Sequence, residues 1–131
     1  TSTVLQAADV SRGLLFWDLQ TMKQLPNAFA LRNAHWSTWT CAVGWAVHGL
    51  DKPDDDPRAV ARSSRGDVLL APGKSNALHL AKFPVLPGAK VRAFAGHSKP
   101  VTSLAFAKPD DHLAYSAGGS DAAILQWAHT R

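Results

Sequence analysis

The stretch that decides the fold reads Gly96-His-Ser-Lys-Pro-Val-Thr-Ser-Leu-Ala-Phe-Ala-Lys-Pro-Asp-Asp-His-Leu-Ala-Tyr-Ser-Ala-Gly-Gly-Ser-Asp-Ala-Ala-Ile-Leu-Gln-Trp127. It contains three short apolar runs, at residues 101–107, 112–118 and 122–127, separated by turns rich in Gly, Pro, Asp and Ser. Apolar runs of this length between such turns predict the β-strands of one small sheet. Large and small apolar residues occupy both sides of each run, which predicts a sheet covered on both faces.

The spacing of the polar landmarks in this stretch is typical of one repeat architecture. Twenty-eight residues separate Gly96-His97 from Gln126-Trp127, the spacing within one four-stranded blade of a WD-repeat β-propeller. We therefore predict an all-β fragment of a WD-repeat β-propeller with about three four-stranded blades, the last lacking its outer strand. A closed ring needs at least about four blades of 40–45 residues, so we expect the chain to be the end of a longer propeller.

Four segments of one propeller domain are predicted. They are a partial blade, an aromatic insert with an acidic loop, a divergent blade and the final WD blade, at residues 1–32, 33–57, 58–95 and 96–131.

Strands are also predicted in the two earlier blades. In the partial blade, strands at 4–8 and 13–18 precede an edge strand within 19–25, and Trp17-Asp18 is the signature pair of the repeat. The divergent blade is expected to hold strands at 58–62, 67–71 and 77–81, with the next edge strand at 90–95.

A structural hydrogen-bond network is predicted within the final blade. The imidazole of His97 is expected to donate to Asp121 and to be tied to the indole N–H of Trp127. A hydroxyl from the second strand normally completes such a network. The expected position holds Ala117, with Ser116 beside it on the opposite face, so we expect a weakened network.

Three catalytic or ligand-binding alternatives fit the residues less well. His97, Asp121 and Ser116 suggest a nucleophilic triad, but no Ser lies in a G-x-S-x-G elbow. Pro72-Gly-Lys-Ser75 lacks the earlier glycine of a phosphate-binding loop, which favours a tight turn. His35, Cys41 and His48 lack the close ligand pair of a zinc site, and the acidic loop lacks calcium-ligand spacing. No catalytic residue, cofactor or metal is therefore expected.

The aromatic insert allows two interpretations. Trp36, Trp39 and Trp45 lie within ten residues of one another. A strand whose buried aromatic rings pack between blades is the first interpretation, and an exposed aromatic patch that binds a partner is the second.

Composition narrows the classes of partner that the protein is expected to bind. The formal net charge is +4 and the basic residues are scattered, which favours neither nucleic acid nor a membrane as a partner. Arg58, Arg62, Arg65 and Lys74 are candidate contacts for an acidic partner. The single Cys41 excludes an internal disulfide and fits a reducing compartment. No apolar run approaches the ~20 residues of a membrane span.

Several stretches together resemble the C-terminal end of the echinoderm microtubule-associated protein-like family, over most of the chain. They are Leu14-Leu-Phe-Trp-Asp18 with Lys23-Gln24, then His35-Trp-Ser-Thr-Trp-Thr-Cys41 with Gly44-Trp45 and Val47-His-Gly49, and finally Gly96-His-Ser98, Val101-Thr102 and Gly118 to Trp127. The insert is the most specific of these, because ordinary WD repeats lack it. The acidic loop and Ala117 depart from the family's pattern.

The resemblance implies a function. That family carries two fused propellers and associates with tubulin and microtubules, including those of ciliary axonemes. By resemblance, the chain is a non-catalytic scaffold in the cytoplasm and cytoskeleton, and in the cilium axoneme. Its implied partners are tubulin, microtubules or axonemal proteins, together with the remaining blades of the parent propeller. The alternative is a general adaptor propeller that binds peptides unrelated to tubulin.

Overall fold

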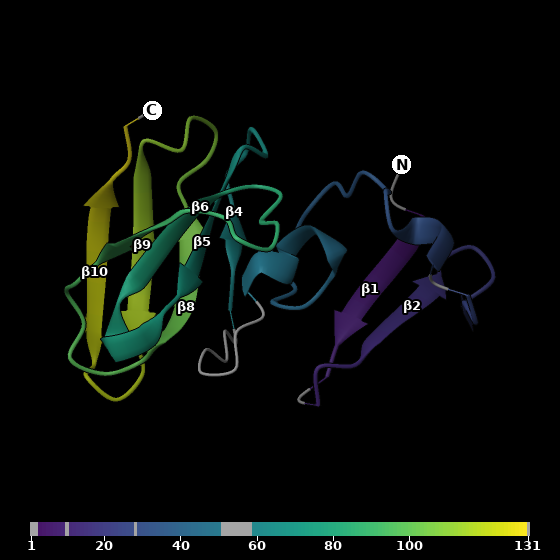
Figure 1. The fold of residues 1–131 in the computed structure, drawn as a ribbon, viewed down its shortest axis with the longest axis horizontal. Coiled ribbons are helices and arrows are strands. Elements are labelled where there is room, and N and C mark those ends of the chain that lie inside the picture. Colours follow the sequence, from purple (N-terminus) through teal and green to yellow (C-terminus); the bar gives the residue numbers. More distant parts are fainter. Residues whose placement is uncertain (1–2, 10, 28, 51–58, 131) are drawn as a thin grey trace.

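The computed structural model describes residues 3–9, 11–27, 29–50 and 59–130, which form three antiparallel sheets (Figure 1). The first sheet has the order β1-β2-β3, with β1 at Val4–Ala8, β2 at Leu14–Asp18 and β3 at Lys23–Gln24. The middle sheet has the order β4-β5-β6-β7, with strands at Ala61–Arg62, Val68–Pro72, Leu78–Lys82 and Val91–Phe94. The last sheet has the order β10-β9-β8, with β8 at Val101–Phe106, β9 at Leu113–Gly118 and β10 at Ala123–Ala128.

The prediction of an all-β propeller fragment is confirmed. Outside the aromatic insert, each predicted apolar run becomes a strand, because Gly, Pro, Asp and Ser in the turns end the runs where the sequence indicates. The predicted edge strand at 90–95 is β7, which pairs with β6 and completes the middle sheet. The strand predicted at 58–62 forms only at Ala61–Arg62 in the described residues, and Arg58 lies outside them.

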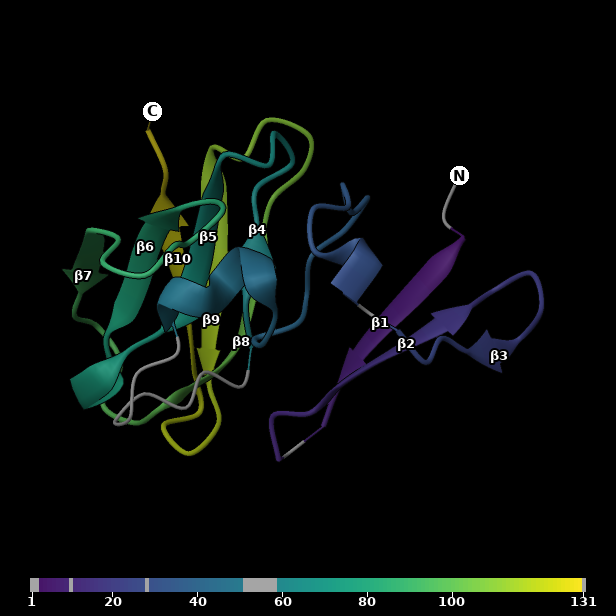
Figure 2. The same cartoon turned by 45° about the vertical axis from the view of Figure 1, so that its right-hand side comes forward.

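The middle sheet carries the core because both of its faces are buried. Along β5, Leu69 and Ala71 join a cluster with residues of the aromatic insert, whereas Leu70 points the other way. Leu70 and Leu78 pack there against Ala114 of the last sheet, with Trp127 at the margin of the cluster. Figure 2 shows the middle sheet between the last sheet and the insert. Successive residues of β5 thus pack on opposite faces of the sheet, against the insert and against the last sheet. This explains the continuous apolar run in β5.

The strand predicted within the aromatic insert is wrong. Residues 33–50 form turns and a 3-10 helix at Trp45–Leu50. The backbone of this helix bonds with the β6–β7 loop: Gly49 N–H donates to Val85 O and Val85 N–H donates to Ala46 O, each at 2.7 Å. A Cβ at position 49 would collide with the Leu86 carbonyl, so this close approach requires glycine.

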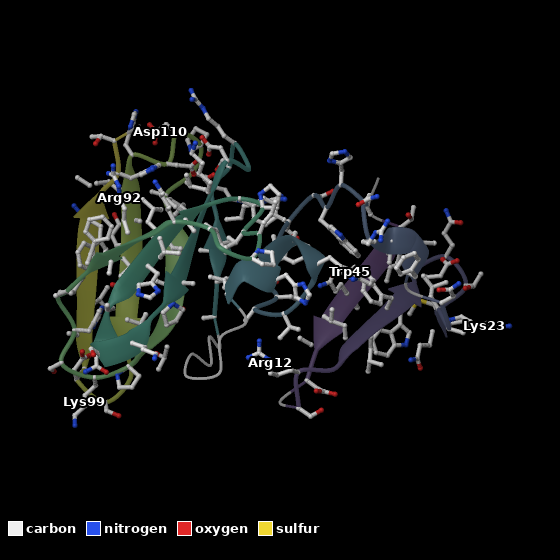
Figure 3. All side chains as sticks on the ribbon, viewed as in Figure 1. Arg12, Lys23, Trp45, Arg92, Lys99 and Asp110 are labelled. Atoms are coloured by element: carbon white, nitrogen blue, oxygen red, sulfur yellow. The ribbon has the colours of Figure 1, made fainter. Side chains whose placement is uncertain are left out.

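The aromatic rings of the insert connect the first sheet to the middle sheet. The ring of Phe16 in β2 lies 6.0 Å from that of Trp45 and 6.1 Å from that of Trp36. Trp36 contacts Trp39 at 6.3 Å, and Trp39 contacts Phe83, just beyond β6, at 5.6 Å. Figure 3 shows Trp45 between the two parts of the molecule. The interpretation of these rings as packing between blades is therefore confirmed.

Truncation of Phe16 is expected to separate the first sheet from the rest. Phe16 is 2% exposed, and Phe→Ala changes in a core cost about 3–5 kcal/mol. Phe16→Ala should therefore lower the free energy of unfolding by that amount, as measured by urea denaturation. Met22→Ala is the control, because Met22 is 77% exposed and surface changes stay within about 0.5 kcal/mol. Equal effects of the two substitutions would contradict this account.

Candidate functional site

The last sheet contains a chain of four hydrogen-bonded side chains. Trp127 Nε1 donates to Ser116 Oγ at 2.8 Å, and His97 Nε2 lies 2.7 Å from the same oxygen. On its other side, His97 Nδ1 lies 2.9 Å from Asp121 Oδ2. The side chains of His97 and Asp121 are 1% and 5% exposed, and Ser116 is 1% exposed. The side chains of His97, Asp121 and Ser116 are therefore shielded from water, and Trp127 is partly buried.

The chemistry of the partners fixes the direction of each hydrogen bond. An indole N–H only donates and a carboxylate only accepts. His97 therefore carries a proton on Nδ1, and in the neutral form of the ring its Nε2 accepts from the Ser116 hydroxyl. The order of donation is Trp127 to Ser116 to His97 to Asp121, and each donor has an acceptor. Buried bonds of this kind contribute about 0.5–1.5 kcal/mol each when neutral and about 1.5–3 kcal/mol to a charged partner.

The expectation of a weakened network is wrong, because Ser116 supplies the hydroxyl. In the register of the last sheet, Trp127 pairs with Ala114 and Leu125 pairs with Ser116. Residues two apart share a face of a strand, so Ser116 lies on the face of Trp127, and Ala117 points to the other face. A one-residue difference in register decides which of the two neighbours joins the network.

The turns around the last sheet bring His97 and Asp121 to Ser116. His97 follows β7 and precedes β8, whereas Asp121 lies in the β9–β10 turn. Asp121 Oδ1 also accepts from Ala123 N–H at 3.0 Å, which holds the carboxylate in the turn. A Cβ at Gly118 would collide with the carboxylate of Asp121. Glycine at 118 is thus required for the carboxylate to reach the imidazole.

Electrostatics at this turn favour the charged form of Asp121. The hydrogen bond from His97 and that from the Ala123 amide together hold the pKa of the Asp121 carboxyl below its ordinary value, and burial opposes them only in part. Both donors stabilise the carboxylate and not the neutral acid.

Ser116, His97 and Asp121 have the connectivity of a hydrolase triad, but the surroundings of Ser116 differ from those of a nucleophile. Its hydroxyl oxygen already accepts the indole N–H of Trp127. Its exposure of 1% leaves no path for a carbonyl carbon to reach Oγ. The arrangement can hold strands and turns together, and it cannot present an activated hydroxyl to a substrate.

Trp17 and Asp18 lie apart from this chain of hydrogen bonds, in β2 of the first sheet. Asp18 Oδ1 accepts from the amides of Gln20 and Thr21 and so forms the turn after β2. Trp17 pairs with Leu5, and Ala7 stands two residues further along β1. Ala7 thus occupies the register position that Ser116 has in the last sheet, so the first sheet lacks the central hydroxyl.

Of the basic residues predicted as partner contacts, the three that the structure describes do not form one patch. Arg65 and Lys74 are both exposed, but they lie at opposite ends of β5. Arg62 is used within the fold: Nη2 donates to Trp36 O and Ser37 O at 2.9 Å each, and the guanidinium lies over the Phe83 ring at 5.2 Å. Burial lowers the pKa of Arg62.

Asp111, between β8 and β9, has a structural role as well. Its Oδ2 accepts from the Ser64 amide at 2.8 Å, and its carbonyl accepts from His129 Nδ1 at 2.9 Å. The buried Asp111 thus ties the β4–β5 turn of the middle sheet to the last sheet. No local pattern identifies this role, because Ser64 lies 47 residues away in the sequence.

Within the described ranges, no group of three or more His, Cys, Asp or Glu side chains is placed to hold a metal ion. No helix in the described part of the chain is long and apolar enough to cross a bilayer. Lys74 and Ser75 lie in a single short 3-10 turn between β5 and β6, without the long helix on which a phosphate-binding loop depends.

Comparison with known proteins places these features in a family. A family model described as the second β-propeller of echinoderm microtubule-associated protein matches residues 1–129. The chain belongs to the echinoderm microtubule-associated protein family. Human echinoderm microtubule-associated protein-like 2 is 39% identical over 118 residues, which cover 87% of this chain and 18% of that protein. The 77 kDa echinoderm microtubule-associated protein of Lytechinus variegatus is 35% identical over 131 residues, 97% of this chain and 20% of that protein.

The relatives of the echinoderm microtubule-associated protein family are much longer than this chain. It spans about a fifth of the length of the two curated relatives described. A third relative, human echinoderm microtubule-associated protein-like 3, is 36% identical over 119 residues, which cover 87% of this chain and 13% of that protein. The matched region corresponds to part of the second propeller of the family.

Removal of the Ser116 hydroxyl is expected to destabilise this family member's last sheet. Ser116→Ala leaves the Trp127 indole N–H without its acceptor and His97 Nε2 without its donor. Unsatisfied buried groups cost about 1–3 kcal/mol each, and denaturant unfolding should show a loss in that range. Ser120→Ala is the matched control, because Ser120 is exposed in the neighbouring turn. A loss for Ser116→Ala no larger than for Ser120→Ala would show that the hydroxyl contributes nothing.

The lowered pKa of Asp121 predicts a pH-dependent contribution to stability. The folded-state pKa lies below the unfolded-state value. The carboxylate therefore stabilises the fold above the unfolded pKa of about 4, and this contribution is lost as the pH falls through the folded pKa. Asp121→Asn should reduce stability at pH 7, and the stabilities of variant and wild type should converge on acidification. Denaturant titrations between pH 7 and pH 3 measure this. A difference that stays constant with pH would refute it.

Proposed function

We propose that the chain is a non-catalytic part of a WD-repeat scaffold that associates with microtubules in the cytoplasmic cytoskeleton. Family membership is the observation that carries the proposal. The match covers residues 1–129, and the relatives are named as microtubule-associated proteins. Ser116, His97 and Asp121 are connected as in a catalytic triad, but the burial of Ser116 supports a structural role for them.

The partners in this proposal include further blades of the same protein. The face of the first sheet that carries Trp17 also exposes Leu5, at 51%, and Leu15. Trp127 occupies the corresponding face of the last sheet, where it packs toward Leu70 and Leu78 of a neighbouring sheet. By this internal equivalence, a further blade covers the face of Trp17, and its burial removes an apolar surface from water.

Direct contact with tubulin is the finer part of the proposal. The net charge of +4 favours an acidic partner surface. Because Arg65 and Lys74 lie at opposite ends of β5, a flat contact at one end of the blades involves only one of them. Substitution of each residue in turn therefore identifies the end of the blades that faces the microtubule. The axonemal location implied by resemblance stays a prediction.

Co-sedimentation with polymerised tubulin tests the proposal in the full-length protein. We expect the protein to pellet with microtubules and to remain in the supernatant without them. Arg65→Glu and Lys74→Glu are a matched pair, and only the substitution at the contacting end should weaken binding, by about tenfold at low salt. Salt should weaken wild-type binding as well.

Two results would contradict the proposal. Failure of the full-length protein to pellet with microtubules would overturn the microtubule assignment, and binding of an unrelated peptide motif would then favour the adaptor alternative. Binding that neither substitution nor salt alters would leave the association intact and would refute its electrostatic part.

A further inference from the structure

A cavity of about 460 Å³ lies between the aromatic insert and the inner edges of the middle and last sheets. Its walls are residues 37–40 of the insert, 60–64 around β4, and 104–106 of β8 with the turn that follows. Its volume falls within the range of about 300–1,000 Å³ that is typical of ligand sites. Three segments distant in the sequence thus converge on one hollow.

The described residues that line the cavity carry charges of one sign. Arg62 and Lys108 are the charged residues among them, and none of them carries a carboxylate. Two hydrogen bonds to the insert hold the Arg62 guanidinium in place through Nη2 alone. Within the described residues, neither Nη1 nor Nε of Arg62 has a hydrogen-bond partner, and Lys108 forms no ion pair. Donors that are held in position without an anion favour an acidic ligand.

Hydroxyl groups complement these cations. Ser37, Thr38 and Thr40 supply them from the insert, and Ser64 supplies one from the turn after β4. Hydroxyls donate to carboxylates and also accept from peptide N–H groups. The lining therefore suits a ligand that carries both acidic side chains and a peptide backbone.

The backbone around the cavity favours an extended ligand. β4 and β8 are each the edge strand of their sheets in the described part of the chain, and both contribute residues to the cavity. An edge strand presents N–H and C=O groups along one side, to which an extended peptide can bond. A compact anion such as free phosphate would leave most of this wall unused.

We propose that this cavity binds an extended peptide segment with Asp or Glu side chains, donated by a partner protein. The acidic side chains pair with Lys108 and with the free nitrogens of Arg62, and the peptide backbone lies along the edge strands. This inference rests on the proposed function, because it assumes that the protein is a scaffold that binds a partner protein. The peptide segment belongs to that partner.

Fluorescence anisotropy with a synthetic peptide tests the inference in the full-length protein. The probe is a fluorescein-labelled Glu-rich peptide, and a Lys-rich peptide of equal length is its counterpart. We expect saturable binding of the Glu-rich probe alone, weakened by salt. Lys108→Glu should weaken binding by about tenfold or more, because it replaces attraction by repulsion at the cavity rim.

Two further variants separate the cavity from the overall charge. Lys99→Glu is the control for Lys108→Glu, because Lys99 is also exposed and lies at the other end of the last sheet from the turn that holds Lys108 and Asp110 (Figure 3). It makes the same change in net charge and should leave affinity within about twofold of wild type. Ala105→Trp fills the cavity from the exposed side of β8 and should abolish binding at unchanged thermal stability.

Several outcomes would overturn the inference. They are the absence of binding to the Glu-rich probe, equal losses for Lys108→Glu and Lys99→Glu, retained binding in Ala105→Trp, and equal affinity for a single-stranded oligonucleotide. Microtubule co-sedimentation of the same preparation distinguishes this failure from failure of the proposed function. A protein that pellets with microtubules but ignores the acidic peptide refutes the cavity inference only.

Discussion

Burial of the middle sheet on both faces is the constraint on which the rest of the structure depends. Leu69 and Ala71 face the insert while Leu70, between them, faces the last sheet. Such a strand is stable only when both neighbours are present, since each face exposed to water loses about 25 cal/mol for every Å² of apolar surface. The insert and the last sheet therefore each bury one face of the middle sheet, although they are far apart in the sequence.

Polar contacts then fix the positions of those neighbours. Within the last sheet, Ser116 joins the indole of Trp127 to the imidazole of His97. Between the last and middle sheets, Asp111 accepts from Ser64, and the Asn76 side chain donates to Ser98 O at 3.0 Å. Apolar packing alone tolerates sliding of one sheet over another, whereas these directional bonds permit one alignment. A buried polar network that aligns neighbouring sheets agrees with membership of a β-propeller family.

The sequence predicts the strands well because their signals are local. Apolar runs between Gly, Pro, Asp and Ser turns identify β5, β6, β8, β9 and β10 closely. The network was predicted in its ends, His97, Asp121 and Trp127. The sequence also offers Ser116 for the centre, but places it on the opposite face, because the choice between Ser116 and Ala117 depends on a register between strands that no local pattern fixes.

Local patterns do not predict the backbone structure of the insert, for a related reason. Its aromatic residues indicate burial, and the structure agrees. Its backbone partner is Val85, which is separated from it by the acidic loop and most of the middle sheet, so a strand was expected where a 3-10 helix forms. The cations of the cavity could be recognised only in three dimensions, because the carbonyls that orient Arg62 precede it by 25 and 26 residues.

Alanine at position 7 gives the first sheet a weaker internal tie than the last sheet, where serine stands at the same register position. Cooperative units within one protein open in the order of their local stability. We therefore expect the amide protons of β1 and β2 to exchange with solvent through smaller local openings than those of β9. Local unfolding is accordingly expected to begin in the sheet that contains Ala7. The sheet that contains Ser116 is expected to open only when the whole fold unfolds.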